Sequence, residues 1–360
     1  VGGIETHFDD LVSELDKKNW KVWVLTYKPI TTKVWAPFFE KRGKNIIIYR
    51  IPWFRGLFYK LVKKPLFEFV FLTPGLFFAL PFLLLSYTNK VQVIHSHGLV
   101  AGFISVFWAK IFRKKVVTTT HSIYHFPKSG LYRNFARWIF DKSDSVLTLS
   151  EQSKIELVAL GINENKIKVF TYWIDLNCFK PIKNAKEKLG WERKFITLFV
   201  GRLVKEKGVL VLLEAAKKWN KYITLVIAGT GPLETIINEQ SAKNKNINYL
   251  GKIDNDKLPL YYSASDLLII PSIHEEGFGR VILESLACGT PVVGSNRGAI
   301  PEAIDNSVGK LIEINQANIV STVEYFHKYP DKLFKLSKET RRYAKKRFSE
   351  KNADTIVEAY

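Results

Sequence analysis

The stretch DLLIIPSIHEEGFGRVILESLACGTPVVGSN, residues 266–296, has the pattern of a strand, a loop, a helix and a second strand. Residues 266–272 form a short apolar run, which predicts a buried strand, and residues 280–288 have the apolar spacing of a helix. Gly289 stands where that helix is expected to end, and residues 291–294 predict the next strand. This alternation of strands and helices predicts an α/β domain.

The loop between the first strand and the helix, residues 275–279, has few side chains that would cover its backbone. Backbone N–H groups at a helix N-terminus favour a phosphate or a sugar hydroxyl, so we expect a ligand there. Glu276 lies in this loop and Glu284 falls in the helix, which predicts two carboxylates at different depths of one cleft. The alternative is that acidic residues here only complement the helix dipole.

Glu276 and Glu284, together with the segments ACGTPVV and GAIPE that follow them, resemble the signature region of retaining glycosyltransferases of family 4. These enzymes have the GT-B fold. The resemblance implies that Glu276 contacts the donor sugar and that Glu284 holds the ribose hydroxyls. It also implies that the backbone of three residues approaches the sugar and phosphate of the donor: Gly277, Phe278 and Gly279.

A second candidate site follows the apolar run at residues 195–201, which predicts a strand buried on both faces of a parallel sheet. Arg202 and Lys207 lie between this strand and the next helix. Arginine grips two oxygens at once and lysine acts as a point charge, so the two cations suit a diphosphate; a solvated charged loop is the alternative. The text GRLVKEKG resembles a family stretch in which both cations bind the donor diphosphate, and the resemblance assigns Gly201 to the same donor site.

In the first half of the chain, residues 115–120 predict a strand that ends at His121. Open α/β sheets bind ligands at the carboxyl ends of their strands, so His121 is a candidate site residue. The family has a histidine at a matching position, near the donor sugar and the reacting centre. His95 and His97 close the preceding strand on one sheet face, but no third ligand accompanies them and we expect no metal there.

Gly2 and Gly3 precede an amphipathic helix predicted for residues 4–15. A tight turn is the simplest interpretation of this pair. The resemblance implies instead that the GGIETH stretch follows the first strand of the domain and faces the donor diphosphate or the acceptor. Because residue 1 is Val, we expect a clipped N-terminus that lacks this central strand.

The length of 360 residues favours two domains. Residues 181–194 are polar and separate two α/β patterns. We therefore expect an acceptor-side domain at residues 1–180, a nucleotide-sugar domain at 181–340, and a helix at 341–360 that returns to the first domain. The resulting fold class is α/β, a GT-B fold in which two Rossmann-like β/α/β domains face an interdomain cleft.

Cysteine usage gives no sign of a disulfide framework or a zinc site, because Cys178 and Cys288 lie far apart without metal-type spacing. A reducing cytoplasm is the default compartment. The acidic triplet at residues 254–256 predicts a turn and a helix cap rather than a metal site. We expect no metal and no cofactor other than the nucleotide-sugar substrate.

The formal net charge is +20, and much of it is concentrated in residues 41–142. This region has 17 Lys and Arg against Glu68 and Asp141, a net charge of +15. Such a field attracts nucleic acid, anionic lipid or a phosphorylated substrate, and charge alone does not decide between them. No nucleic-acid-binding module is recognisable, so we do not expect nucleic acid as a partner.

Residues 45–64 mix aromatic side chains with five cations, and residues 69–87 are then uncharged. The five cations are Arg50, Arg55, Lys60, Lys63 and Lys64. A 19-residue helix is about 28 Å long, close to the thickness of a bilayer core. Pro74, Gly75 and Pro81 are expected to interrupt such a helix.

A single membrane crossing would also separate two halves of one domain. We therefore expect a buried or membrane-surface helical hairpin, with ordinary core as the alternative. Residues 47–87 are expected to bind the cytoplasmic face of an anionic membrane.

The resemblance implies transfer of a sugar to an acceptor hydroxyl with retained anomeric configuration. The departing phosphate oxygen would take the acceptor proton, so no dedicated base is expected. We expect a lipid-linked or cell-envelope glycan as acceptor and a peripheral enzyme on the inner face of the cytoplasmic membrane. The alternatives are a glycogen- or starch-synthase-like transferase with a soluble glucan acceptor, a GT-B sugar-nucleotide epimerase, and a nucleic-acid-binding protein. The base, the sugar, the acceptor and the oligomeric state stay open.

Overall fold

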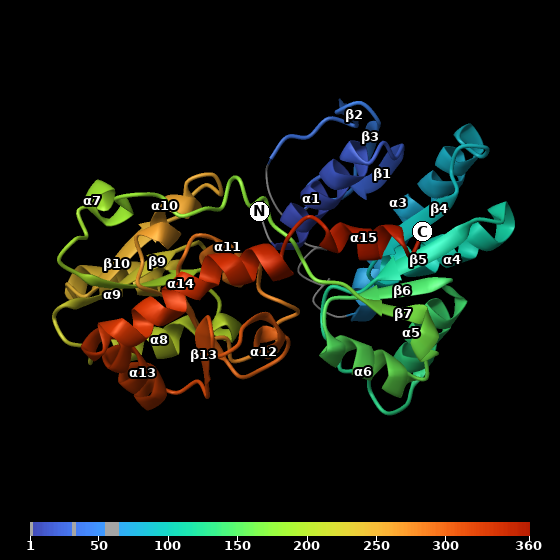
Figure 1. Cartoon of the computed structure of the whole chain (residues 1–360). Coiled ribbons are helices and arrows are strands. Elements are labelled where there is room, and N and C mark those ends of the chain that lie inside the picture. Colours follow the sequence, from blue (N-terminus) through green and yellow to red (C-terminus); the bar gives the residue numbers. More distant parts are fainter. Residues whose placement is uncertain (1–2, 31–33, 55–64) are drawn as a thin grey trace. The chain divides into compact units, whose positions relative to one another are not determined.

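The computed structural model describes residues 3–30, 34–54 and 65–360, which form two compact units (Figure 1). Unit 1 comprises Val1–Leu149, Ser153–Phe170 and Ala353–Tyr360, and unit 2 comprises Ser150–Gln152 and Thr171–Asn352. The sequence predicts the corresponding boundaries after residues 180 and 340.

The described residues of unit 1 form two sheets. The first has the order β1-β3-β2, with β1 (Val22–Tyr27) parallel to β3 (Ile46–Ile51) and β2 (Phe39–Arg42) antiparallel to β3. The second is fully parallel, in the order β4 (Val93–His97), β5 (Lys115–Thr119), β6 (Ser145–Thr148) and β7 (Ile167–Val169). The helices of this part of the chain are α1 (Gly3–Lys17), α3 (Pro65–Ser86), α4 (Leu99–Phe112), α5 (Leu131–Lys142), α6 (Glu151–Leu160), η1 (Glu164–Lys166) and α15 (Asn352–Val357).

Strand β3 opens the aromatic and basic stretch at residues 45–64, for which the sequence predicts no strand. Ile46 and Ile48 are buried and Ile47 between them is less so, which is the alternation of a strand with one covered face. Isoleucine is also β-branched and favours strands.

Helix α3 runs without a break through Pro74 and Gly75, so the predicted interruption is wrong. The hydroxyl of Tyr27, from β1, donates to the carbonyl of Leu72 (2.5 Å) and accepts from the backbone N–H of Leu76 (3.0 Å). These two backbone groups are an i, i+4 pair, and the tyrosine hydroxyl bridges them. A side chain inserted in this way keeps the polar groups of a bent helix satisfied.

Pro81 is accommodated by a second side chain. Proline has no N–H, so the carbonyl of Phe77, four residues earlier, loses its helical donor. The indole Nε1–H of Trp108, from α4, donates to that carbonyl (2.8 Å). Tertiary hydrogen bonds therefore preserve the helix where local sequence predicts a break.

Helix α3 packs one face against a core cluster of unit 1 and exposes the other. It is long and apolar enough to cross a membrane by length and composition. Leu80 and Leu84 are its buried apolar residues among those described, whereas much of the helix is exposed. Core packing therefore accounts for one face of this segment only. The basic residues Arg55, Lys60, Lys63 and Lys64 lie outside the described residues.

Unit 2 is built on one parallel sheet with helices over both faces (Figure 1). The strand order is β10 (Ile247–Gly251), β9 (Ile223–Ala228), β8 (Phe195–Val200), β11 (Leu267–Ile270), β12 (Val292–Ser295) and β13 (Gly309–Ile312). Its helices are α7 (Ala185–Leu189), η2 (Lys205–Lys207), α8 (Val209–Ala216), α9 (Glu234–Lys243), α10 (Leu258–Ser263), α11 (Arg280–Ala287), α12 (Ile300–Ala303), α13 (Gln316–Lys328) and α14 (Pro330–Arg347).

The strands and the helix predicted within residues 266–296 are confirmed as β11, α11 and β12. The prediction of a helix cap at residues 254–256 is wrong in part, because the triplet forms a turn but α10 begins after Lys257 without a side-chain cap.

Candidate active site

The loops that follow β8 and β9 are locked together by their backbones. Gly229 has φ +142°, and a Cβ at this position would lie 1.9 Å from the carbonyl oxygen of Gly201. The backbone N–H of Leu203 donates to the carbonyl of Thr230 (3.0 Å). Only glycine permits this approach at residue 229, so the loop that carries Arg202 has a fixed path.

The loops that follow β8 and β11 are joined in the same way. Gly208 has φ +68°, and a Cβ there would lie 1.8 Å from the carbonyl oxygen of Pro271. The backbone N–H of Ile273 donates to the carbonyl of Glu206 (3.0 Å). Because β8 and β11 are neighbours in the sheet, these contacts bring two loops that are distant in sequence to one edge.

This edge brings together two of the predicted site residues. Nζ of Lys207 lies 2.7 Å from Oε2 of Glu276, and the Glu276 side chain is 8% exposed. The other carboxylate oxygen, Oε1, accepts a hydrogen bond from the hydroxyl of Ser272. An ion pair between a buried carboxylate and a half-buried ammonium therefore occupies the position predicted for a diphosphate and a sugar.

The backbone of Glu276 rests on the segment GAIPE. Its carbonyl accepts the N–H of Ala299 (2.9 Å). Gly298 has φ +57°, and a Cβ there would lie 2.6 Å from the backbone nitrogen of Glu276. The close contact at Gly298 thus fixes the position of the Glu276 loop. This contact gives the glycine of the GAIPE segment a structural role.

Glu284 is buried in the first turns of α11 and has a defined orientation. The hydroxyl of Tyr262, from α10, donates to its Oε2 (2.9 Å), and Nε of Arg280 lies 3.9 Å from its Oε1. Burial and the Glu284 carboxylate raise the pKa of Tyr262 well above its usual range, so the tyrosine stays a protonated donor at neutral pH.

Sequence reasoning missed Tyr262, Arg280 and the loop at residues 171–173. Arg280 is buried, and its Nη1 donates to the carbonyl of Trp173 (3.2 Å) while its guanidinium lies over the ring of Tyr172. The sequence signal for Arg280 is that an arginine opens a mostly apolar helix. The side chain of Phe278 is also buried and contacts Tyr172, so only its backbone is available to a ligand.

Unit 1 contains a separate cluster of histidines around the predicted residue His121. Nε2 of His121 and Nδ1 of His97 are 2.9 Å apart, within hydrogen-bond distance. His95 hydrogen-bonds to the hydroxyls of Thr119 (2.6 Å) and Tyr360 (2.8 Å). The ring of His7, from α1, lies 5.6 Å from that of His121. His7 was not predicted, although its spacing from the apolar residues 11 and 15 is helical.

His95, His97 and His121 are neutral at pH 7. Burial lowers the pKa of His121 to about 4, and burial together with the charge of His121 lowers the pKa of His95 to about 3. Burial and the neighbouring histidines also lower the pKa of His97. Each neutral imidazole has one N–H and one unprotonated nitrogen. In the His97–His121 hydrogen bond, one ring therefore donates its N–H and the other ring accepts.

We expect acid to destabilise unit 1 through this cluster. A histidine with a folded pKa below its unfolded value stabilises the fold fully above about pH 6.5, and this contribution is lost as the pH falls towards 4. His121 alone contributes on the order of 3 kcal/mol. Thermal unfolding measured between pH 7.5 and 4.5 checks this, with His121→Asn as the matched variant. A wild-type melting temperature that falls no more steeply than that of the variant would contradict it.

The remaining predicted residues have less defined positions. Gly2 lies outside the described residues, and Gly3 begins α1. Arg202 lies exposed in the loop after β8. Within residues 3–30, 34–54 and 65–360, no group of three or more His, Cys, Asp or Glu is placed to hold a metal ion.

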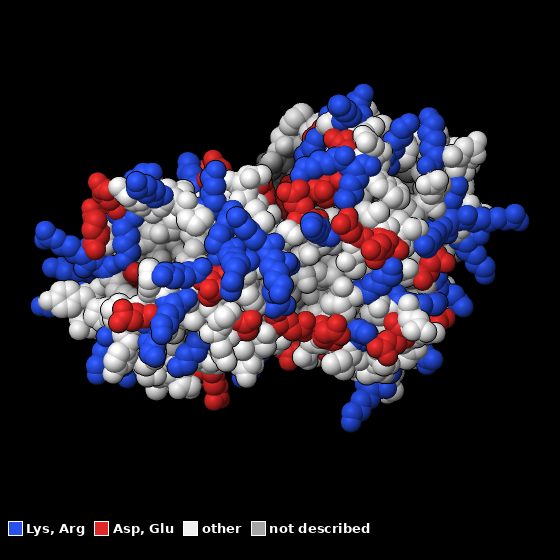
Figure 2. Space-filling view, viewed as in Figure 1, with Lys and Arg blue, Asp and Glu red and all other residues white. Residues whose placement is uncertain are grey.

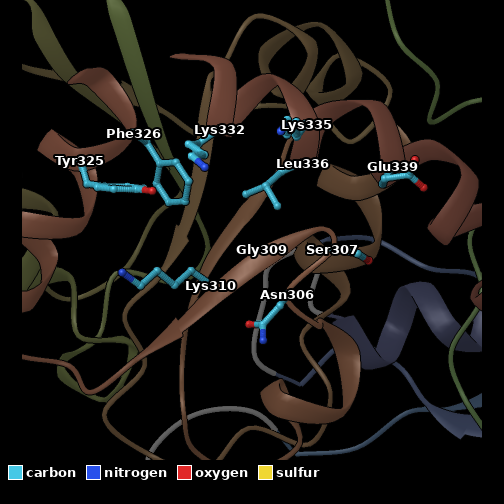
Figure 3. A pocket seen from close by; sticks show the side chains of 10 residues that line it. All are labelled: Asn306, Ser307, Gly309, Lys310, Tyr325, Phe326, Lys332, Lys335, Leu336 and Glu339. Carbon is cyan, nitrogen blue, oxygen red and sulfur yellow. The ribbon is translucent and has the colours of Figure 1, made fainter. Parts of the chain in front are cut away.

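A surface hollow of about 540 Å³ lies in unit 2 between β13, α13 and α14 (Figure 3). Its lining is partly apolar and partly cationic: Asn306, Ser307, Gly309, Lys310, Tyr325, Phe326, Lys332, Lys335, Leu336 and Glu339. None of the predicted site residues lines it. The hollow is open to solvent and its lysines extend from the surface, so its chemistry is less specific than that of the Lys207–Glu276 edge.

Two family models together match almost the whole chain. The model described as Glycosyltransferase Family 4 matches residues 1–177, and the model described as Glycosyl transferases group 1 matches residues 181–347. A protein of Klebsiella pneumoniae named "Uncharacterized 41.2 kDa protein in cps region" is 32% identical over 255 residues, which are 66% of this chain and 70% of that protein. In several other curated relatives the match spans little more than half of their length.

Solved structures share the fold. Sucrose-phosphate synthase from Thermosynechococcus elongatus has a TM-score of 0.83 at 21% identity, covering 100% of this chain and 93% of that one. Anabaena HepE in complex with UDP-glucose has a TM-score of 0.75 at 19% identity, covering 99% of this chain and 95% of that one.

Proposed function

The chain belongs to glycosyltransferase family 4, and on that premise we propose that it is a retaining enzyme that moves a sugar from a nucleotide-diphosphate donor to an acceptor hydroxyl. The observation that carries this proposal is the Lys207–Glu276 pair on interlocked loops of unit 2. Both residues stand at the carboxyl edge of a parallel sheet, where α/β folds bind nucleotides.

The cations of the β8 loop are proposed to stabilise the leaving group. Departure of the nucleotide diphosphate is the step in which negative charge develops, so positive charge that is held in place beforehand lowers its barrier. Lys207 supplies a point charge, and Arg202 supplies a planar group that grips two phosphate oxygens. The departing phosphate oxygen takes the acceptor proton on the same face of the sugar.

The carboxylates are proposed to contact the donor's two sugars. Glu276 contacts the transferred sugar, and Glu284 accepts from the ribose hydroxyls. The backbone of Gly277 and Gly279 approaches the phosphate, and Gly201 approaches the same donor. His121, neutral at pH 7, is the proposed sugar-contacting residue of unit 1. No metal and no further cofactor take part in this proposal.

A uridine diphosphate sugar is the first donor to test, because HepE, which has the same fold, forms a complex with UDP-glucose. A lipid-linked or cell-envelope glycan is the proposed acceptor, and the enzyme is proposed to be peripheral on the cytoplasmic face of the membrane. The exposed apolar surface of α3 supports this choice over a soluble glucan.

The test is a screen of nucleotide-diphosphate sugars for thermal stabilisation, followed by NMR of the product's anomeric configuration. A stabilising donor whose sugar is transferred with retention supports the proposal. Conversion of the donor to an epimer without any acceptor would identify an epimerase, and efficient transfer to soluble glucan would identify a glycogen-synthase-like enzyme. Inversion at the anomeric carbon would refute the mechanism.

We expect Glu284→Ala to raise the donor KM about 10- to 100-fold with a smaller effect on kcat. Ribose contacts are made equally in the ground and transition states, and hydrogen bonds to a charged group contribute about 1.5–3 kcal/mol. Steady-state kinetics with varied donor checks this. Tyr262→Phe is the matched control, since it keeps the carboxylate and removes only the hydroxyl that orients it. A collapsed kcat with an unaltered donor KM would show that the ribose role is misassigned.

A further inference from the structure

The outer face of α3 and α4 is an apolar stripe on the surface of unit 1. On α3, Phe78, Phe82 and Leu85 follow one another at helical spacing and are 65%, 71% and 65% exposed. On α4, Phe107 and Ile111 are 40% and 58% exposed. Large side chains exposed singly are ordinary, but a continuous stripe over two helices marks an interaction surface.

The two helices present these side chains as one surface. Phe107 packs against Phe77, which is adjacent to Phe78, with ring centroids 5.0 Å apart. At the end of the helices, Nζ of Lys114 donates to the carbonyl of Thr88 (2.5 Å). These contacts hold α3 and α4 side by side along their length.

The surroundings of the stripe are positively charged. Residues 69–140 contain eight Lys and Arg and no Asp or Glu. Lys110 and Arg113 are exposed at the end of α4, and neither forms an ion pair with any residue that the structure describes. Figure 2 shows Lys and Arg side chains extending into solvent from the projecting end of α4.

We propose that the stripe docks on an anionic lipid bilayer, with α3 lying in the plane of the interface. Apolar side chains enter the acyl boundary while Lys110 and Arg113 contact acidic headgroups. This inference rests on the proposed function, because it names the surface through which a lipid-linked acceptor is reached. It narrows the segment predicted from the sequence, residues 47–87, to the exposed face of α3 and adds α4, whose cations replace those between residues 50 and 64.

Peripheral docking fits the packing better than the other occupants. A spanning α3 would have to leave unit 1, and its hydrogen bonds with Tyr27 and Trp108 together with buried Leu84 hold it there. A second copy of the chain would bring two surfaces of the same positive charge together, which disfavours association. An anionic bilayer complements both the apolar stripe and the charge.

The experiment is co-sedimentation of the full chain with vesicles of phosphatidylglycerol and phosphatidylcholine, or of phosphatidylcholine alone. We expect binding to the anionic vesicles that weakens, without vanishing, as salt rises. The variant Phe78→Ser/Phe82→Ser/Leu85→Ser should bind at least about tenfold less. The variant Lys110→Glu/Arg113→Glu should remove most of the salt-dependent component of vesicle binding. The matched control replaces three exposed apolar residues of unit 2 by serine and should bind like the wild type: Tyr222, Ile236 and Phe334.

Four results would overturn the docking proposal. The first is wild-type protein that stays in the supernatant at low salt, and the second is a stripe variant that binds vesicles like the wild type. The third is resistance to alkaline carbonate extraction, which would indicate a spanning helix. The fourth is a wild-type dimer that binds no vesicles and that the stripe variant cannot form, which would indicate a second copy as the occupant.

Stabilisation by the nucleotide sugar is measured on the same proteins. An unchanged donor response in the stripe variant shows that unit 2 is intact. If no donor stabilises any of them while vesicle binding holds, then the proposed function fails and the docking surface stands.

Discussion

Lys207→Ala is expected to lower kcat at least about a hundredfold while the fold survives. A charge-assisted hydrogen bond contributes roughly 1.5–3 kcal/mol, and the charge on the leaving diphosphate grows in the transition state. Lys207 lies at the end of η2 and its side chain is 28% exposed, so truncation leaves no buried cavity. Turnover at saturating donor and the melting temperature are the two measurements.

Lys205→Ala is the matched control, since it removes an exposed lysine from the same short helix. It should change kcat little. If Lys207→Ala turns over like the wild type at saturating donor, then the assignment of Lys207 to the diphosphate is wrong.

Glu276→Gln is expected to lower kcat/KM about a hundredfold and to leave the affinity for free nucleoside diphosphate unchanged or higher. Glutamine keeps the shape of the side chain, and its amide oxygen still accepts from Ser272, but the charge opposite Lys207 is lost. The ammonium is then free to bind a diphosphate, whereas the sugar loses its carboxylate contact. Kinetics together with calorimetric titration of UDP separates the two effects.

Two further variants sharpen this prediction. Glu275→Gln removes the adjacent carboxylate and should be nearly neutral. The double variant Lys207→Ala/Glu276→Gln should lose less activity than the two single losses combined, because residues in contact act as a unit. Parallel weakening of sugar transfer and of nucleoside diphosphate binding in Glu276→Gln would mean that the carboxylate only positions Lys207.

Local sequence was sufficient to predict the strands and helices whose formation depends on residues that are close together in the chain. The apolar runs at residues 195–201 and 266–272 became β8 and β11, and the helical spacing after residue 279 became α11. A strand buried on both faces of a parallel sheet must be apolar throughout, so such strands can be recognised from the sequence alone. The family followed from motif spacing in the same segments.

Contacts between residues far apart in the chain decided the features that the sequence pattern did not predict. Pro81 predicts a break, but Trp108 supplies the missing donor from another helix. The pairing of Lys207 with Glu276 depends on two loops that meet only because their strands are neighbours in the sheet. In each case the partner lies tens of residues away along the chain.

The sequence by itself thus determined the family and the α/β class, because these depend on local pattern and spacing. Only the tertiary structure decided that α3 is continuous, that an ion pair joins Lys207 and Glu276, and that His7 packs against His121. It also left one face of α3 exposed while Leu80 and Leu84 pack into a core cluster. The physical reason is that hydrogen-bond satisfaction and burial depend on which distant elements the packed fold brings together.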